Sequence, residues 1–436
     1  MRFLTRLSLF FLSLISFSVI AAPINKTDLS VVEKMYKDIG LSIAGIDTTR
    51  RVDHIDIELK KSALVNVYPY DKNKHKLHFK YFLLNESGRI VYLKIPKGVD
   101  GKKLTSLSGV ENLEALEILK IRDHEISNLK PLSKLKNIRG LDLSRNNIKN
   151  ASSLRYLSRL EFLNLNYNSL ESTRFFSGLK SLKSLECKPC KISSLKGMEV
   201  MQYLQYIRIN AEEIVSIEEI RSLEGLRNIT MSVGDVTDFS PLGEKLKLER
   251  LHINGGAGSL NFLSSLVNLE KLYLIGNKFN SIPDLSKLKE IKTIELSRTA
   301  IKKITGLENL SNLKYLTLNN NKNITKIEGL DGLISLRDLK LKGSAIKKME
   351  NLNLPRLESL DLSKTEITKM ENMGEMPELY DLAIHDTKIK KIEGYLDAPK
   401  LTDVGIEYSG EFYENNKEAI DFLDKRKKDT YSFLLD

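Results

Sequence analysis

The sequence of 436 residues predicts an α/β solenoid: a horseshoe of stacked coils with a parallel inner sheet, short 3₁₀ or turn-like return segments and a cap at each end. Three observations predict it. The pattern L-x-x-L-x-L-x-x-N-x-L, complete in LEFLNLNYNSL at 160–170, recurs along most of the chain. Its copies follow one another at a nearly constant spacing, which is typical of solenoids. Within each copy, apolar and polar residues alternate as they do in a strand.

The copies are recognised by their first apolar residue. After a first step of 26 residues, the steps between copies are 21 to 23 residues. The fifteen first positions are Ile90, Leu116, Ile138, Leu160, Leu182, Leu204, Leu226, Leu248, Leu269, Ile291, Leu313, Leu336, Leu357, Leu379 and Leu401. Between strands, apolar residues recur at roughly three-residue steps, a spacing that favours tight 3₁₀ turns. No coil can bury its apolar face alone, so neighbouring coils must stack.

The repeat resembles that of the leucine-rich repeat family. The period and linkers such as ISNLKPLSKLKN (126–137) and ITGLENLSN (304–312) are most similar to the short repeats of bacterial internalins. The resemblance covers about residues 90–410 and implies the horseshoe fold. Because this fold hosts many binding proteins, it does not imply one activity. Internalins usually continue into an immunoglobulin-like domain and a surface anchor, neither of which we recognise here, so the resemblance does not carry an adhesin role.

Residues 1–21 predict a secretory signal peptide. Arg2 and Arg6 precede an apolar run at 7–20, and small residues follow at Ala21 and Ala22. Cleavage after Ala21 would lower the formal net charge from +11 to +9, because two arginines and no acids are lost. An uncleaved anchor is the alternative, but the apolar run is short for a membrane span. We expect an exported protein, periplasmic or secreted, with no membrane span in the mature chain.

Residues 22–89 predict an N-terminal cap region. Asp28 or Ser30 would cap a helix through 31–39, and Gly40 would end it. A hairpin that turns at 85–88 would then lead into the first repeat.

The repeats occupy 90–410, and residues 411–436 predict a C-terminal helical cap. Asn415 or Asn416 would be its N-cap. Its apolar side would consist of Ala419, Ile420, Phe422 and Leu423.

The Asn position of the repeat is not uniform. The resemblance implies that its side chain points inward and hydrogen-bonds the backbone of adjacent coils. Asn146 and Asn168 fit this role, whereas Glu212, Gly234 and Gly256 do not. We therefore expect the segment 204–260 to be irregular or more mobile than its neighbours.

The two cysteines form a C-x-x-C pair. Cys187 occupies an apolar strand position and Cys190 the Asn position, so both should point inward. This favours two buried, small apolar side chains over a redox or metal site, which would need an exposed cysteine. A structural disulfide is the alternative, although the distance from strand to turn looks wide for one. We find no catalytic set, phosphate loop or metal motif, so the sequence predicts no enzyme and no cofactor.

The candidate binding surface is the concave face. Strand residues on either side of the second Leu point away from the core. Aromatic and basic residues concentrate there, and such side chains anchor many protein interfaces. A tolerated, half-exposed sheet is the alternative. The candidate partner-binding residues are Phe162, Tyr167, Tyr206, Arg208, Arg250, His252, Lys271, Tyr273 and Tyr315. They predict a monomeric, non-catalytic protein-binding module with a protein partner and no nucleic acid.

A second candidate surface is a lysine-rich flank. Pairs of lysines recur after the last apolar position of three copies. They are Lys302, Lys303, Lys347, Lys348, Lys390 and Lys391. Stacking would align them as a basic stripe that could bind an anionic envelope glycan or lipid. The alternative is a solvated face that opposes aggregation.

Overall fold

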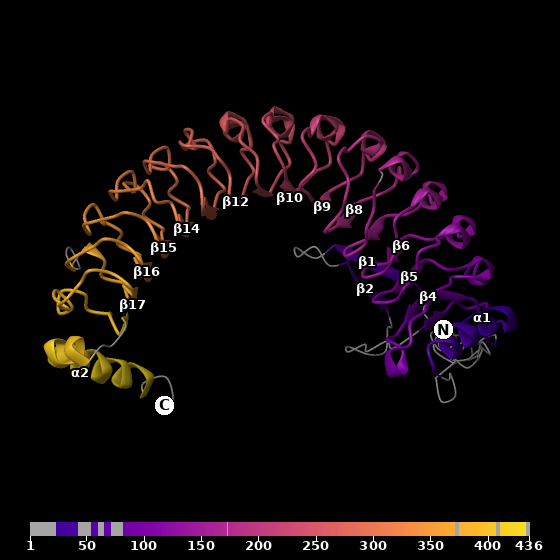
Figure 1. The fold of residues 1–436 in the computed structure, drawn as a ribbon, viewed down its shortest axis with the longest axis horizontal. Helices are drawn as coiled ribbons and strands as arrows, with labels where there is room; N and C mark the ends of the chain where they lie inside the picture. Colours follow the sequence, from indigo (N-terminus) through magenta and orange to yellow (C-terminus); the bar gives the residue numbers. More distant parts are fainter. Residues whose placement is uncertain are drawn as a thin grey trace, which may run out of the picture.

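The chain forms an open arc of stacked coils (Figure 1). The computed structural model describes residues 23–41, 54–59, 65–70, 82–171, 173–370, 375–406 and 410–432. The predicted signal peptide lies outside these residues. Helices α1 (Lys26–Asp38) and α2 (Gly410–Ser432) lie at the two ends of the arc. The prediction of a horseshoe solenoid is thus confirmed.

A 16-stranded sheet lines the inner side of the arc, and β3 to β18 follow one another in it in sequence order. Only β3 and β4 pair antiparallel; all later neighbours are parallel. Strands β4 to β18 therefore provide one strand for each of the fifteen predicted copies. The strands are β3 (Phe82–Leu84), β4 (Ile90–Ile95), β5 (Ile118–Ile121), β6 (Gly140–Asp142), β7 (Phe162–Asn164), β8 (Ser184–Cys187), β9 (Tyr206–Ala211), β10 (Asn228–Val233), β11 (Arg250–Asn254), β12 (Lys271–Ile275), β13 (Thr293–Glu295), β14 (Tyr315–Thr317), β15 (Asp338–Lys340), β16 (Ser359–Asp361), β17 (Asp381–Ala383) and β18 (Asp403–Gly405).

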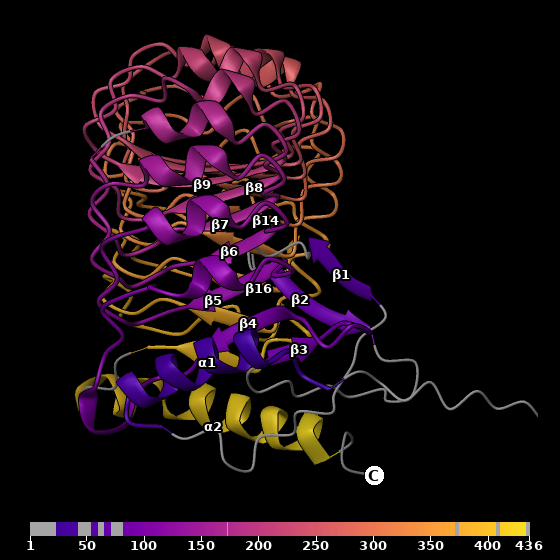
Figure 2. The ribbon, with the colours of Figure 1, turned by 90° about the vertical axis from the view of Figure 1, so that its right-hand side faces the viewer.

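A separate two-stranded antiparallel sheet joins β1 (His54–Leu59) to β2 (Val65–Tyr70). Figures 1 and 2 show it on the concave side of the first coils. The sequence did not predict this element.

Return segments run along the outer rim of the arc (Figure 1). Up to residue 265 the coils use 3₁₀ helices, as predicted. They are η1 (Val99–Gly101), η2 (Val110–Asn112), η3 (Lys130–Lys134), η4 (Ser152–Tyr156), η5 (Arg174–Gly178), η6 (Met198–Val200), η7 (Glu218–Ser222), η8 (Ser240–Glu244) and η9 (Asn261–Ser265). Between 266 and 370 the coils return through single turns, such as the hydrogen bond of 3.0 Å from the Leu310 amide to the Leu307 carbonyl.

A ladder of inward asparagines joins adjacent coils. The side chain of Asn321 is fully buried. Its amide donates to the carbonyls of Leu296 and Leu318 at 2.7 and 2.9 Å, and its oxygen accepts from the Thr299 amide at 2.8 Å. Asn146 and Asn168 make equivalent bonds. Each asparagine thereby satisfies backbone groups that a buried turn would otherwise leave unpaired.

The prediction of an irregular segment at 204–260 is wrong for its strands, because β9, β10 and β11 are among the longest of the sheet. Main-chain bonds replace the asparagine ladder here: the Gly256 amide donates to the Gly234 carbonyl at 3.1 Å. Gly256 has φ +82°, and a Cβ atom there would lie 2.5 Å from the Phe239 ring. Glycine thus lets the coils approach closely. Higher mobility of this segment stays a prediction.

Helix α1 differs from its predicted start. Its N-cap is Asn25, whose side chain accepts from the amides of Thr27 and Asp28. Asp28 is instead fully buried and accepts from the Arg89 guanidinium at 3.0 Å and from the Ile90 amide at 2.8 Å. It ties the helix to β4, so the predicted capping role of Asp28 or Ser30 is wrong. Gly40, with φ +76°, follows the helix as predicted.

Helix α2 is longer than predicted and already begins at Gly410, so neither Asn415 nor Asn416 is its N-cap. Asn416 is buried, and it binds the last coil by accepting from the Ile392 amide at 2.6 Å and donating to the Lys390 carbonyl at 3.1 Å. Of the predicted apolar side, Phe422 is 38% exposed while the other three residues are buried. The division of the chain into signal, cap, repeats and cap stays a prediction.

None of the helices in the described residues is long and apolar enough to cross a membrane.

We predict that Asn321→Ala lowers the free energy of unfolding by about 3 kcal/mol, because it leaves several buried backbone groups unpaired. Chemical denaturation would measure this. Asn309→Ala, which changes an exposed asparagine of the preceding coil, should have almost no effect. Equal stability of the two variants would contradict a structural role of the ladder.

We also predict that His124 makes the fold sensitive to acid. It takes the Asn position and accepts from the Leu104 amide at 3.1 Å, and its buried Nε2 has no hydrogen-bond partner among the described residues. Burial and then Lys103 lower its pKa below the ordinary 6.5. Below pH 6.5 the unfolded chain therefore takes up the proton first, and stability falls with pH until the folded-state pKa is passed. His124→Asn should reduce this loss in denaturation curves between pH 7 and about pH 5. An unchanged pH dependence would disprove the assignment.

Candidate binding face

In-register strands arrange the outward residues of the concave face in two rows. One row runs through Tyr206, Asn228, Arg250 and Lys271. The other runs through Arg208, Thr230, His252 and Tyr273. Neighbouring strands lie about 4.8 Å apart, so side chains within a row are close neighbours. Figure 2 shows the N-terminal strands β4 to β9 one above another.

Six of the nine predicted binding residues come together in these rows on β9, β11 and β12. We call them the central patch: Tyr206, Arg208, Arg250, His252, Lys271 and Tyr273. All six side chains are half-buried. The rings of His252 and Tyr273 lie 5.6 Å apart. The patch contains three permanent cations and no acid, so it combines aromatic area with positive charge.

Burial tunes the titratable groups of the central patch. It lowers the pKa of His252, and the nearby cations Lys188 and Arg208 lower it further. His252 is therefore neutral near pH 7. Burial also raises the pKa of Tyr273. The Nε of Arg208 is buried and has no hydrogen-bond partner in the described part of the chain.

The other three predicted residues lie apart from the central patch. Phe162, on β7, is only 3% exposed. Tyr167 follows the strand in a left-handed turn with φ +57°, and Arg145 stacks over its ring at 4.2 Å. Tyr315, on β14, is 46% exposed and stands two strands beyond Lys271 in the same row.

A pocket of about 270 Å³ lies on the concave face beside the first coils. Its apolar lining includes Tyr92, Ile118 and Phe162, and Lys120 and Glu186 are among its charged residues. Burial raises the pKa of Tyr92 to about 12 and lowers the pKa of Lys120. We had not predicted Tyr92, Ile118, Lys120 or Glu186 as site residues. Each of them stands next to the second apolar position of its copy, and this position in the repeat could have identified them.

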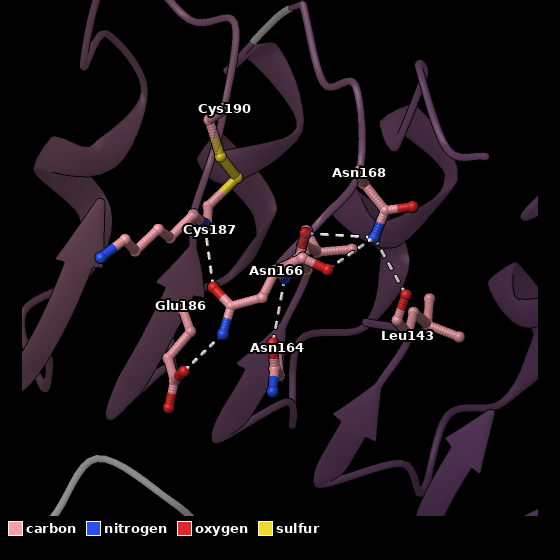
Figure 3. The surroundings of a disulfide bond; sticks show 9 residues. Leu143, Asn164, Asn166, Asn168, Glu186, Cys187 and Cys190 are labelled. Atoms are coloured by element: carbon pink, nitrogen blue, oxygen red, sulfur yellow. Dashed lines mark hydrogen bonds between the residues drawn. A yellow bond between two sulfur atoms is a disulfide. The ribbon is translucent and has the colours of Figure 1, made fainter. Parts of the chain in front are cut away.

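Cys187 and Cys190 form a disulfide, with Cα atoms 5.6 Å apart (Figure 3). The separation is within the range that a disulfide spans, so the expectation of too wide a distance is wrong. Both residues are buried, as predicted.

The disulfide loop is linked to the concave face through Asn166. Asn166 accepts from the Lys188 amide at 2.8 Å and donates to the Glu186 carboxylate at 2.6 Å (Figure 3). Burial raises the pKa of Glu186.

The lysine-rich flank is exposed. All six predicted lysines are on the surface, and within the described residues only Lys391 forms an ion pair, at 3.4 Å from Glu393.

The residue after the first apolar position of each copy forms a different flank, where charges pair across coils. Lys183 lies 2.7 Å from Glu161, Arg227 lies 2.6 Å from Glu249, and Arg337 lies 2.8 Å from Glu358. These three cations are thus paired with acids of the neighbouring coil.

Within the described ranges, no group of three His, Cys, Asp or Glu could hold a metal ion.

We predict that a Cys187→Ala/Cys190→Ala variant loses about 2 kcal/mol of its free energy of unfolding. The loss is at the low end for a disulfide because the closed loop is short. Denaturation of both proteins without reductant would measure the difference. A control is the wild type with reductant, which should approach the variant. Alkylation of native, unreduced protein would contradict the disulfide.

Comparison with known proteins supports the fold. Residues 275–387 match the family model for the leucine-rich repeat domain of the endo-beta-N-acetylglucosaminidase EndoS. A protein phosphatase 1 regulatory inhibitor subunit PPP1R7 homolog of Arabidopsis thaliana is 32% identical over 127 residues, 28% of this chain. The match spans only 38% of that relative's length.

Solved structures are similar over more of the chain. An internalin (inlF) of Listeria monocytogenes superposes with a TM-score of 0.60 at 20% identity, covering 90% of this chain and 100% of that one. The ectodomain of the Arabidopsis thaliana receptor kinase GASSHO1/SCHENGEN3, in complex with CASPARIAN STRIP INTEGRITY FACTOR 2, has a TM-score of 0.62 at 20% identity. It covers 75% of this chain and 43% of that one. In its repeats and its fold, the chain is thus similar to leucine-rich repeat proteins, internalins among them.

Proposed function

We propose that the chain is an exported, non-catalytic protein that binds a protein partner through its concave face. The observation that carries this proposal is the central patch, where aromatic and basic side chains from three strands meet on a regular sheet. Such a surface is already ordered before binding, so the partner does not have to order it. Tyr206 and Tyr273 offer large contact areas with few rotatable bonds.

Two further observations support the proposal. The receptor ectodomain with a similar fold is a complex with a named factor, and the Arabidopsis relative is named as a regulatory subunit of a phosphatase. A buried disulfide at Cys187–Cys190 favours an oxidising compartment, as the predicted signal peptide does.

The lysine-rich flank supports a second candidate function. Five of its six lysines form no ion pair among the residues that the structure describes, so the flank keeps its charge. An anionic envelope glycan or lipid headgroup could bind there. This mode should weaken steeply with salt, whereas aromatic contacts on the concave face should weaken only modestly.

We predict that Tyr206→Ala/Arg250→Ala/Tyr273→Ala/Tyr315→Ala abolishes capture of the partner. Mature protein would be immobilised and exposed to cell-envelope and host-cell extracts, and the affinity for any captured protein would then be measured. Removing these four side chains of the concave face should weaken binding by about a hundredfold or more.

A matched control removes exposed aromatic residues that belong to no strand of the sheet: Tyr156→Ala/Tyr203→Ala/Tyr380→Ala. It should bind the partner like the wild type. Circular dichroism would establish that both variants are folded. If the concave-face variant retains the partner while Lys302→Gln/Lys347→Gln/Lys390→Gln loses it, the lysine-rich flank is the site and the first proposal fails.

A further inference from the structure

The cations of the central patch are not held in ion pairs. Arg208, Arg250 and Lys271 form no ion pair with any carboxylate of the described chain. On the flank of the same coils the cations are paired, as Arg227 is with Glu249 and Lys292 with Glu270 at 3.2 Å. Cations of this flank therefore form ion pairs across coils, whereas the three cations of the central patch form none with the described residues.

Two of these cations are direct neighbours. Arg250 on β11 is paired in register with Lys271 on β12. Like charges directly opposite each other on a sheet destabilise the pairing of the strands. An anionic group lying between the two side chains would convert this repulsion into attraction.

Arg208 is unsatisfied in a second way. Its Nε is buried and donates no hydrogen bond to the described residues. The nearest acid in the same row is Glu186 on β8, which is in register with Arg208. The Glu186 carboxylate instead accepts a hydrogen bond from Asn166. A buried donor without an acceptor costs free energy that an incoming acceptor would recover. Charged acceptors form the stronger bonds, often two at once with a guanidinium.

The surface between these cations is hollowed. A small pocket of about 40 Å³ is lined by residues of β8 to β11, with Tyr206, Arg208 and Arg250 on its wall. Ser184 and Glu186 line both this pocket and the larger one. His252 stands two residues after Arg250 on β11, and its ring lies 5.6 Å from that of Tyr273 on β12. A carboxylate can thus enter between two guanidinium groups while the rest of the partner lies on aromatic rings.

We propose that the central patch binds a segment of the partner that is rich in aspartate and glutamate. This rests on the proposed function of the concave face and names the chemistry of its partner. Arg208 and Arg250 are on strands about 10 Å apart. Two carboxylates of an extended segment that are three residues apart match that distance, because each residue spans about 3.4 Å. Arg208 and the Arg250–Lys271 pair are the two anchor points.

The test measures binding of three fluorescent peptides of equal length, each with one tyrosine, by anisotropy. The first is rich in Glu and Asp, the second carries Gln and Asn instead, and the third carries Lys. The wild type should bind the acidic peptide about tenfold or more tightly than the amide peptide. Arg208→Gln/Arg250→Gln/Lys271→Gln should lose this preference.

The matched control removes three cations of the paired flank, Arg227→Gln/Lys292→Gln/Arg337→Gln. It changes the net charge equally but should retain the preference for the acidic peptide. Equal binding of acidic and amide peptides by the wild type would overturn the proposal. So would an equal loss in both triple variants, because net charge alone would then explain the binding.

The outcome also separates this proposal from the proposed function. Suppose that the wild type captures a partner that the concave-face variant loses, while acidic and amide peptides bind equally. The concave face is then the binding site, but it does not recognise its partner through acidic side chains. Preference for the acidic peptide that disappears only in Lys302→Gln/Lys347→Gln/Lys390→Gln would place anion binding on the lysine-rich flank and overturn the inference.

Discussion

The stacking of the coils depends on hydrogen-bond partners for the backbone groups of each turn that enters the core. In most coils one inward side chain does this, as Asn321 does for the coils on either side of it. Where that side chain is missing, as at Gly256, the coils come close enough for main-chain bonds between neighbours. Both solutions hold successive strands in register, and register is what turns one position of the repeat into a continuous row.

The rows explain how a repeat with a uniform core can have distinct surfaces. A position next to the second apolar residue always faces the concave side, so Arg250 and Lys271 become neighbours although 21 residues separate them in sequence. A position next to the first apolar residue always faces a flank, where Arg227 finds Glu249. The core residues fix the coil, and the remaining positions are free to define a binding surface.

The period made most of the fold predictable, because fifteen copies repeat the same local signal. The same reasoning identified Tyr206, Arg208, Arg250, His252, Lys271 and Tyr273 as outward residues that lie together. It failed where one residue has a unique tertiary partner. Asp28 and Asn416 are residue types that commonly cap helices. Asp28 instead binds Arg89, and Asn416 accepts a hydrogen bond from the Ile392 amide. Neither contact leaves a trace in the local sequence.

The candidate residues outside the central patch differ in their surroundings. Tyr167 lies beyond its strand in a left-handed turn, where it is 52% exposed and Arg145 stacks over its ring. Phe162 has the right position, but it is buried beside the first coils, unlike Tyr315 in the same row. Position in the repeat therefore decides which way a side chain points, and the local surroundings decide whether it is accessible. In the central patch both conditions hold, and there the half-buried cations form no ion pair with the described residues, unlike Arg227 on the flank. An anionic group would relieve the cost of leaving these cations unpaired, and for this reason the charge pattern, more than the aromatic residues, leads us to propose an acidic partner.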